Sequence, residues 1–155
     1  MAVDDRFTRV GFCIHRNTPR IVPIKTNTLF LLLIMSQALH SLEEYLSRLW
    51  EFLAPARLIS GLFSANLAVG FGLANLTIVA FGLWCYLGPV RHDWRSARGI
   101  MWFWALLELG NSIGHTFFAM GVAGYFPGLY TVPALFVCAS LLLVRLLKND
   151  NGSST

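Results

Sequence analysis

Ionisable side chains at helical spacing stand inside two otherwise apolar stretches of this sequence. Two sets share the pattern: His40, Glu43 and Glu44 in the first stretch, and Glu108, Asn111 and His115 in the second. Residues three, four and seven positions apart lie on one face of an α-helix. Each stretch therefore predicts one polar stripe that carries imidazole and carboxylate groups, and the second stripe adds an amide.

A divalent metal site is the first chemistry that these residues suggest. His40 and Glu44, four positions apart, can both bind one metal ion from a single helix, and His115 would supply a third ligand. Glu43 would then activate water as the general base. Zinc or another divalent ion bound in this way would support hydrolysis. The likeness to inverted zinc proteases is partial, because Glu44 stands where that motif has its second histidine.

Metal-free acid and base chemistry is a second interpretation. The neighbouring carboxylates and the two histidines can exchange protons with a substrate, and Asn111 can orient a substrate oxygen. The reaction would be an isomerisation, hydration or cyclisation of a sterol-like or terpenoid-like molecule. The catalytic candidates are Glu43, Asn111 and Glu108, and the metal-ligand candidates are His40, Glu44 and His115.

Two interpretations without catalysis stay open. His40 and His115 could bind a haem from its two sides, although neighbouring glutamates do not suit the apolar walls of a haem cleft. The polar groups could instead only hold helices together, which such hydrogen bonds do for about 0.6 kcal/mol each in membranes. Ionisable groups inside a membrane are by default functional. Glu44 could also form an ion pair with Arg48, one helical turn further on.

The elements that must position the two stripes are predicted to be transmembrane helices. Hydrophobic residues make up 55% of the 155 residues and charged residues only 13%, whereas soluble domains are about a quarter charged. We expect an all-α, four-transmembrane-helix bundle, since a span needs about 20 apolar residues. The predicted spans are 28–53, 61–87, 99–124 and 125–147 within a membrane domain over 28–148, flanked by a basic tail over 1–27 and a polar tail over 149–155.

The depth of the two stripes in the membrane also agrees. The first and third spans start on the same side, so depth can be counted from Thr28 and Gly99 at about 1.5 Å per residue. His40 then lies roughly 18 Å deep, and both Glu44 and His115 lie roughly 24 Å deep. The two stripes are therefore expected to face each other in one buried site.

The basic residues predict orientation and partners. Ten of the 12 Lys and Arg residues fall on one side of the four predicted spans, which places both termini in the cytoplasm of a multi-pass protein. The net charge of +4 is assigned to lipid headgroups and not to nucleic acid, because the basic residues flank apolar segments. The expected partners are the lipid bilayer and a lipophilic small-molecule substrate, with a homo-oligomer compatible with a chain this short.

The pentapeptide His40-Ser41-Leu42-Glu43-Glu44 resembles the signature of the HXXEE domain family of small membrane proteins. Asn111 and His115, followed by Tyr125-Phe126-Pro127-Gly128 and Thr131, are similar to the second half of that family. The resemblance runs from the first predicted span to the fourth. It implies a membrane architecture and a site at these residues, and it implies no particular reaction.

Overall fold

The protein is helical throughout the part of the chain that the structure describes. The computed structural model describes residues 24–122 and 124–151, and these contain no strand. This confirms the predicted all-α class. Residues 1–23 of the expected basic tail and residues 152–155 of the expected polar tail lie outside the described residues.

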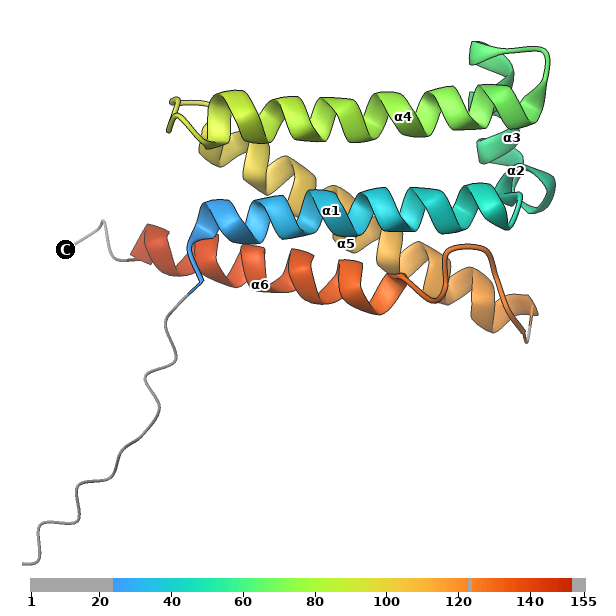
Figure 1. The fold of residues 1–155 in the computed structure, drawn as a ribbon. Helices are drawn as coiled ribbons and strands as arrows, with labels where there is room; N and C mark the ends of the chain where they lie inside the picture. The colour runs from blue at the N-terminus through green and yellow to red at the C-terminus, as the bar shows by residue number, and fades with distance from the viewer. Residues whose placement is uncertain (1–23, 123, 152–155) are drawn as a thin grey trace, which may run out of the picture.

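Four long helices dominate the described residues: α1 (Thr26–Leu46), α4 (Leu67–Cys85), α5 (Ala97–Val122) and α6 (Val132–Asn151). Two short helices, α2 (Leu49–Phe52) and α3 (Ala54–Phe63), connect α1 to α4, and a π-helical turn, η1 (Tyr86–Val90), extends α4. In Figure 1, α1 lies between α4 and α6 and runs antiparallel to both, while α5 slants behind them from the η1 end of α4 toward the start of α6.

The first helix is shorter than the sequence predicts. A continuous helix over 28–53 was expected, but α1 ends at Leu46, so this boundary is wrong. The Ser47 hydroxyl donates a hydrogen bond to the Glu43 carbonyl, and Arg48 takes the left-handed conformation with φ of 59°, which turns the chain. Pro55 does not end this helix; it lies in the first turn of α3, where a missing N–H costs nothing.

The later boundaries differ in the same way. The predicted span over 61–87 begins six residues later, at Leu67, because Asn66 caps α4 by accepting hydrogen bonds from two backbone N–H groups. Gly88 and Pro89 do not stop this segment, which continues as η1 to Val90. The span expected over 125–147 corresponds to α6, which starts at Val132, after a loop, and runs on to Asn151.

Helix α3 folds back along the start of α4 at a glycine. A Cβ atom at Gly70 would lie only 2.0 Å from the Ser60 carbonyl oxygen. Only glycine therefore allows this close approach of two backbones. The contact holds α2 and α3 across one end of the molecule, beside the end of α1 (Figure 1).

Two hydrophobic clusters fill the interior. The larger one joins the first half of α1, the first half of α5 and most of α6 around Phe30, Trp104 and Leu142. The smaller one lies at the other end, around Trp50 and Phe71. The buried polar residues of α1 and α5 fall between the two clusters along both helices: Gln37, His40, Ser41, Glu44, Glu108, Ser112 and His115.

One described helix is long and apolar enough by itself to cross a membrane, the continuous segment Leu67–Val90 formed by α4 and η1. The polar stripes on α1 and α5 lower the mean hydropathy of those helices. Length and composition alone thus support one of the four predicted spans, the second one.

Candidate metal centre

Three ligand candidates converge between α1 and α5. The Nε2 atom of His115 lies 2.9 Å from Oε1 of Glu44, and the Nε2 atom of His40 lies 3.3 Å from the same oxygen. One ligand atom from each residue falls within 4.8 Å of the others, and all three residues are buried. Ligand atoms around a tetrahedral zinc ion with bonds of about 2.0–2.1 Å are about 3.3 Å apart, so the spacing suits one metal ion.

The two imidazole rings meet edge to face. Their centroids are 4.7 Å apart and their planes make an angle of 79°. A haem held by two histidines lies between the rings, and this contact leaves no space for a macrocycle. The geometry thus favours a single small ion over the haem interpretation.

The outer nitrogen of His115 is fixed by the loop between α5 and α6. Nδ1 of His115 lies 2.7 Å from the carbonyl oxygen of Pro127. A carbonyl oxygen only accepts, so Nδ1 carries the hydrogen and the neutral ring has its lone pair on Nε2, the atom that faces Glu44. Metal-binding histidines characteristically donate their other ring N–H to such a partner.

His40 is fixed in the same sense through a hydroxyl group. Its Nδ1 lies 2.8 Å from Oγ1 of Thr131, and this oxygen donates to Oε2 of Glu43 over 2.6 Å. Because the threonine proton points to the carboxylate, the hydroxyl accepts from Nδ1–H of His40. Nε2 of His40 then holds a lone pair. This nitrogen is fully buried and makes no hydrogen bond, although it lies 3.3 Å from Oε1 of Glu44.

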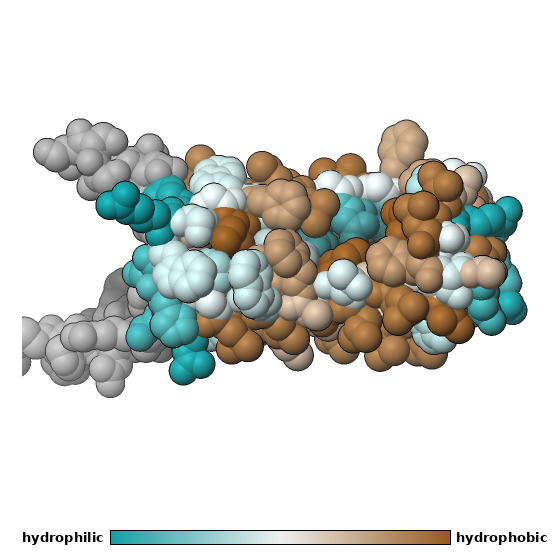
Figure 2. Space-filling view, turned by 90° about the horizontal axis from the view of Figure 1, so that it is seen from above, coloured by the Kyte–Doolittle hydropathy of each residue, from teal (hydrophilic) through white to brown (hydrophobic). Residues whose placement is uncertain are grey.

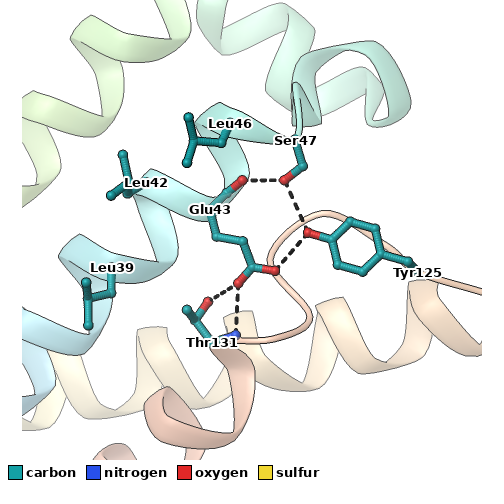
Figure 3. A pocket seen from close by; sticks show the side chains of 7 residues that line it. All are labelled: Leu39, Leu42, Glu43, Leu46, Ser47, Tyr125 and Thr131. Atoms are coloured by element: carbon teal, nitrogen blue, oxygen red, sulfur yellow. Dashed lines mark hydrogen bonds between the residues drawn. The ribbon is translucent and has the colours of Figure 1, made fainter.

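Glu43 lies on the loop side of the histidines. Its carboxylate accepts from the Tyr125 hydroxyl at 2.8 Å, the Tyr130 N–H at 3.0 Å and the Thr131 N–H at 2.9 Å, besides the Thr131 hydroxyl. Figure 3 shows it pointing from α1 toward the loop, beside a surface hollow lined by Leu39, Leu42 and Leu46. With four donors on two oxygens, Glu43 holds Thr131, and it does not line the cavity that contains Glu44, Glu108 and His115.

Gly128 lies between the two rings. Its φ of +92° belongs to the left-handed region, and a Cβ atom there would come within 2.7 Å of Cε1 of His40 and 2.8 Å of Nδ1 of His115. Only glycine fits both the backbone conformation and the space. The loop thus touches both histidines, through a hydrogen bond to each and through this close contact.

A cavity of about 620 Å³ opens on the other side of the cluster. Its polar wall contains Glu44, His115, Glu108 and Asn111, and the remaining lining is mostly apolar. Among these lining residues there is no Lys or Arg. The sequence-predicted residues Glu108 and Asn111 therefore share one cavity with the metal-ligand candidates.

Glu108 is held by two amides. The Gln37 side chain ends 2.7 Å from Oε2 and 3.2 Å from Oε1 of Glu108, and 3.1 Å from the Ser41 hydroxyl; we assign its nitrogen to the Glu108 side, where it donates to the carboxylate while its oxygen accepts from Ser41. Asn111 donates to Oε2 of Glu108 over 3.4 Å. The carboxyl group is 1% exposed, so these amides and the cavity are its surroundings.

Arg48 does not bind Glu44. It pairs with Glu51 at 2.6 Å on the exposed surface, because the chain turns at Arg48. The ion pair considered from the sequence would require α1 to continue as one helix, and its absence leaves Glu44 to the histidines.

The loop side of the site was indicated from the sequence only through the family resemblance. The catalytic and metal-ligand candidates included no residue of 125–131, although the Tyr125 hydroxyl, the Pro127 carbonyl and Gly128 all contact the site. Pro-Gly is a turn signal, and Thr131 follows it closely. Backbone carbonyls carry no sequence signature of their own, so only the turn itself could have been predicted.

Comparisons of the chain with protein family models, curated proteins and solved structures found no match.

Proposed function

We propose that this chain is a multi-pass membrane protein that binds one divalent metal ion through His40, Glu44 and His115 and hydrolyses a lipophilic substrate. Two histidines, one glutamate and a water molecule make a ligand set found in hydrolytic zinc enzymes, so zinc is the proposed metal. One observation carries the proposal: in a buried space two imidazole Nε2 atoms, each on a ring whose Nδ1 already has a hydrogen-bond partner, face one carboxylate oxygen.

Electrostatics supports a cation at this point. Neutral histidines that donate from Nδ1 bring two lone pairs toward a carboxylate oxygen, and such groups repel each other when nothing positive lies between them. Burial strengthens that repulsion because the local dielectric constant is low. A divalent ion would turn the same three atoms into ligands and would satisfy the unpaired Nε2 of His40.

Hydrolysis assigns roles to the remaining cavity groups. A bound divalent ion lowers the pKa of its water and polarises a carbonyl oxygen. Glu108 would take one proton from the attacking water, whose oxygen bonds to the carbonyl carbon, and would return that proton to the leaving alkoxide as the ester bond breaks. Asn111 would orient Glu108 through its hydrogen bond. The reaction consumes one ester and one water molecule and forms one carboxylic acid and one alcohol.

The surface supports a membrane environment. Large apolar side chains are exposed on every long helix, among them Leu39 at 58%, Leu76 at 64%, Phe117 at 75% and Val137 at 53%. On the face drawn in Figure 2, hydrophobic residues cover most of the middle of the molecule and hydrophilic residues gather at both ends. Water-soluble monomers rarely expose apolar surface on this scale. We therefore propose that α1, α4, α5 and α6 all cross the bilayer.

The placement of charge supports an orientation. The starts of α1 and α5 and the ends of η1 and α6 lie together (Figure 1), and this end carries Lys25, Arg91, Arg95, Arg98, Arg145 and Lys148. Arg48 and Arg57 lie at the other end. The more basic end belongs in the cytoplasm. Membership of the HXXEE family is part of the same proposal, resting on the pentapeptide at 40–44 and the later residues that contact it.

Metal-free acid and base chemistry is the second candidate. It is favoured by a second carboxyl group, Glu108, in the same cavity as Glu44 and His115. Protons in place of a metal ion would also relieve the repulsion between the imidazoles and Glu44. This reading predicts the same essential residues and differs from the first in metal content.

Elemental analysis of the protein purified in detergent separates the two candidates. The metal proposal predicts about one zinc per chain in the wild type and loss of that zinc in both His40→Ala and His115→Ala, with helicity by circular dichroism unchanged. His92→Ala is the matched control, because His92 is exposed and its ring, within the described part of the chain, bonds to the Gly88 carbonyl, and this variant should retain the metal. A folded wild type that binds no divalent metal would sink the proposal in favour of proton chemistry.

A further inference from the structure

The cavity beside the metal-ligand candidates has two chemically different parts. Its polar wall carries Glu44, Glu108 and His115, and its other walls carry apolar side chains of α2, α3, α4 and α5, such as Leu49, Ile59 and Phe71. A volume of about 620 Å³ lies within the range of small-molecule sites, about 300–1,000 Å³. The shape suits a molecule with one polar group and one hydrocarbon part.

The rim of the cavity lies between α4 and α5. Ile78 on α4 and Leu106 and Leu107 on α5 all line the cavity, yet they are 40%, 54% and 46% exposed. Gly110 lines the cavity on α5 and is also exposed. Side chains that are both lining and exposed mark an opening, so the cavity reaches the apolar surface of the molecule.

The arrangement of the helices explains this opening. Helices α4 and α5 are joined through η1 at the basic end and separate from there, because α5 slants toward α6 while α4 stays beside α1 (Figure 1). Helix α3 lines the far end through Pro55, Ala56 and Ile59, of which Pro55 and Ile59 are also exposed, so the opening continues along α3. Figure 2 shows a small hydrophilic patch within the hydrophobic middle of the face that it draws, partly covered by apolar side chains.

The charged residues that line the cavity limit which kind of polar group can bind in it. Two carboxyl groups, Glu44 and Glu108, line the cavity, and among the described residues no Lys or Arg lines it. An anionic headgroup would find no partner besides the metal and would meet Glu108. An uncharged ester or amide has no such cost, since burying an unpaired charge is far more expensive than burying a paired dipole.

We infer that a single-chain amphiphile with an uncharged ester or amide group enters this cavity sideways from the bilayer, between α4 and α5, and places that group at the metal. This inference rests on the proposed metal site and adds to it the class of substrate and the path of entry. The hydrocarbon chain lies along Ile78, Leu106 and Gly110 and extends into lipid.

Two hydroxamates test the inference, because both bind zinc and they differ only in chain length. Binding of hexadecanohydroxamate and of acetohydroxamate is measured on the zinc-loaded full chain in one detergent, with Gly110→Leu and Gly121→Leu beside the wild type. A Cβ atom at either glycine meets no atom within 4 Å, and leucine favours a helix over glycine. Both variants should therefore fold, and Gly121 does not line the cavity.

The inference predicts that Gly110→Leu weakens hexadecanohydroxamate binding at least tenfold and changes acetohydroxamate binding less than twofold, while Gly121→Leu changes neither. Equal binding of the long-chain probe by the wild type and Gly110→Leu would overturn the lateral path but leave the metal site intact. A wild type that binds neither zinc nor acetohydroxamate would overturn the proposed function and this inference with it.

Discussion

The two histidines have a loop side and a cavity side, and the two sides differ in how their polar atoms are satisfied. On the loop side every contact is complete: Nδ1 of His115 meets the Pro127 carbonyl, and Nδ1 of His40 meets Thr131, which Glu43 holds. On the cavity side the Nε2 atom of His40 has no hydrogen bond. Complete hydrogen bonding suits groups that position others, and an unpaired buried nitrogen beside a carboxylate and a cavity suits a group that binds a ligand.

Adjacent glutamates fall on opposite sides of this division. Glu43 accepts four hydrogen bonds from the loop, and Glu44 shares one oxygen with both histidines beside the cavity. Neighbouring residues on a helix point about 100° apart, so one dipeptide can supply both the ligand and the group that orients it.

Gly128→Ala should cause the largest loss of zinc affinity, because the added methyl group would push against the rings of both histidines. The added Cβ would lie within 3 Å of both rings, at a φ that only glycine adopts easily, with strain of about 1–3 kcal/mol. Loss of a group that hydrogen-bonds a metal ligand typically lowers metal affinity by up to about 100-fold. We expect the zinc affinity of this variant to fall by more than that. Chelator competition measures this. Gly121→Ala is the control, and wild-type affinity in Gly128→Ala would show that the loop does not position the histidines.

Glu108→Gln should separate chemistry from binding on the cavity side. Glutamine keeps the shape and cannot take a proton from water, so hydrolysis of a long-chain 4-nitrophenyl ester should fall about 10²–10⁴-fold. Zinc content should stay at the wild-type level because Glu108 is not among the ligand candidates. Loss of zinc together with activity would instead make Glu108 a ligand.

Glu43→Gln should have a smaller effect, on the loop side alone. The substitution removes the charge and replaces one acceptor oxygen by a donor, which faces either the Thr131 N–H and hydroxyl or the Tyr130 N–H and Tyr125 hydroxyl. Weakening the hydrogen bonds that orient a metal ligand typically lowers metal affinity about 10–100-fold, and chelator competition can measure a change of this size. Glu51→Gln, at an exposed ion pair with Arg48, should leave the affinity unchanged. A complete loss of activity with full zinc affinity would restore Glu43 as the general base.

Arg48→Ala should have the smallest effect. Its ion pair with Glu51 is exposed on both sides, and such pairs contribute about 0–1 kcal/mol. The free energy of unfolding in detergent should change by less than about 1 kcal/mol, and zinc affinity should not change. A drop in zinc affinity would mean that Arg48 acts on Glu44 after all.

The cavity side was largely predictable from sequence, and the loop side was not. Helical periodicity puts His40 with Glu44, and Glu108 with Asn111 and His115, on single faces, and equal depth suggested that the faces meet. The structure brings His40, Glu44 and His115 together. The Pro127 carbonyl and the left-handed Gly128 depend on backbone conformation, which no side-chain pattern specifies.

The break after α1 illustrates the same limit. The apolar pattern continues from α1 into Leu49 and Trp50, so periodicity predicted one helix over 28–53. Two local features mark the break: the Ser47 hydroxyl bonds the Glu43 carbonyl, and Arg48 adopts a positive φ. The first is a side chain that competes for a backbone acceptor. The Glu43 carboxylate in addition accepts from Tyr125, in a loop about 80 residues away.

Zinc-edge X-ray absorption of the full chain, loaded with one equivalent of zinc in detergent, tests the central claim most directly. The account predicts a first shell of nitrogen and oxygen atoms at about 2.0–2.1 Å, with the outer scattering of two imidazole rings, and loss of one ring in His115→Ala. A shell with sulfur at about 2.3 Å, or no tightly bound zinc in a folded protein, would contradict it.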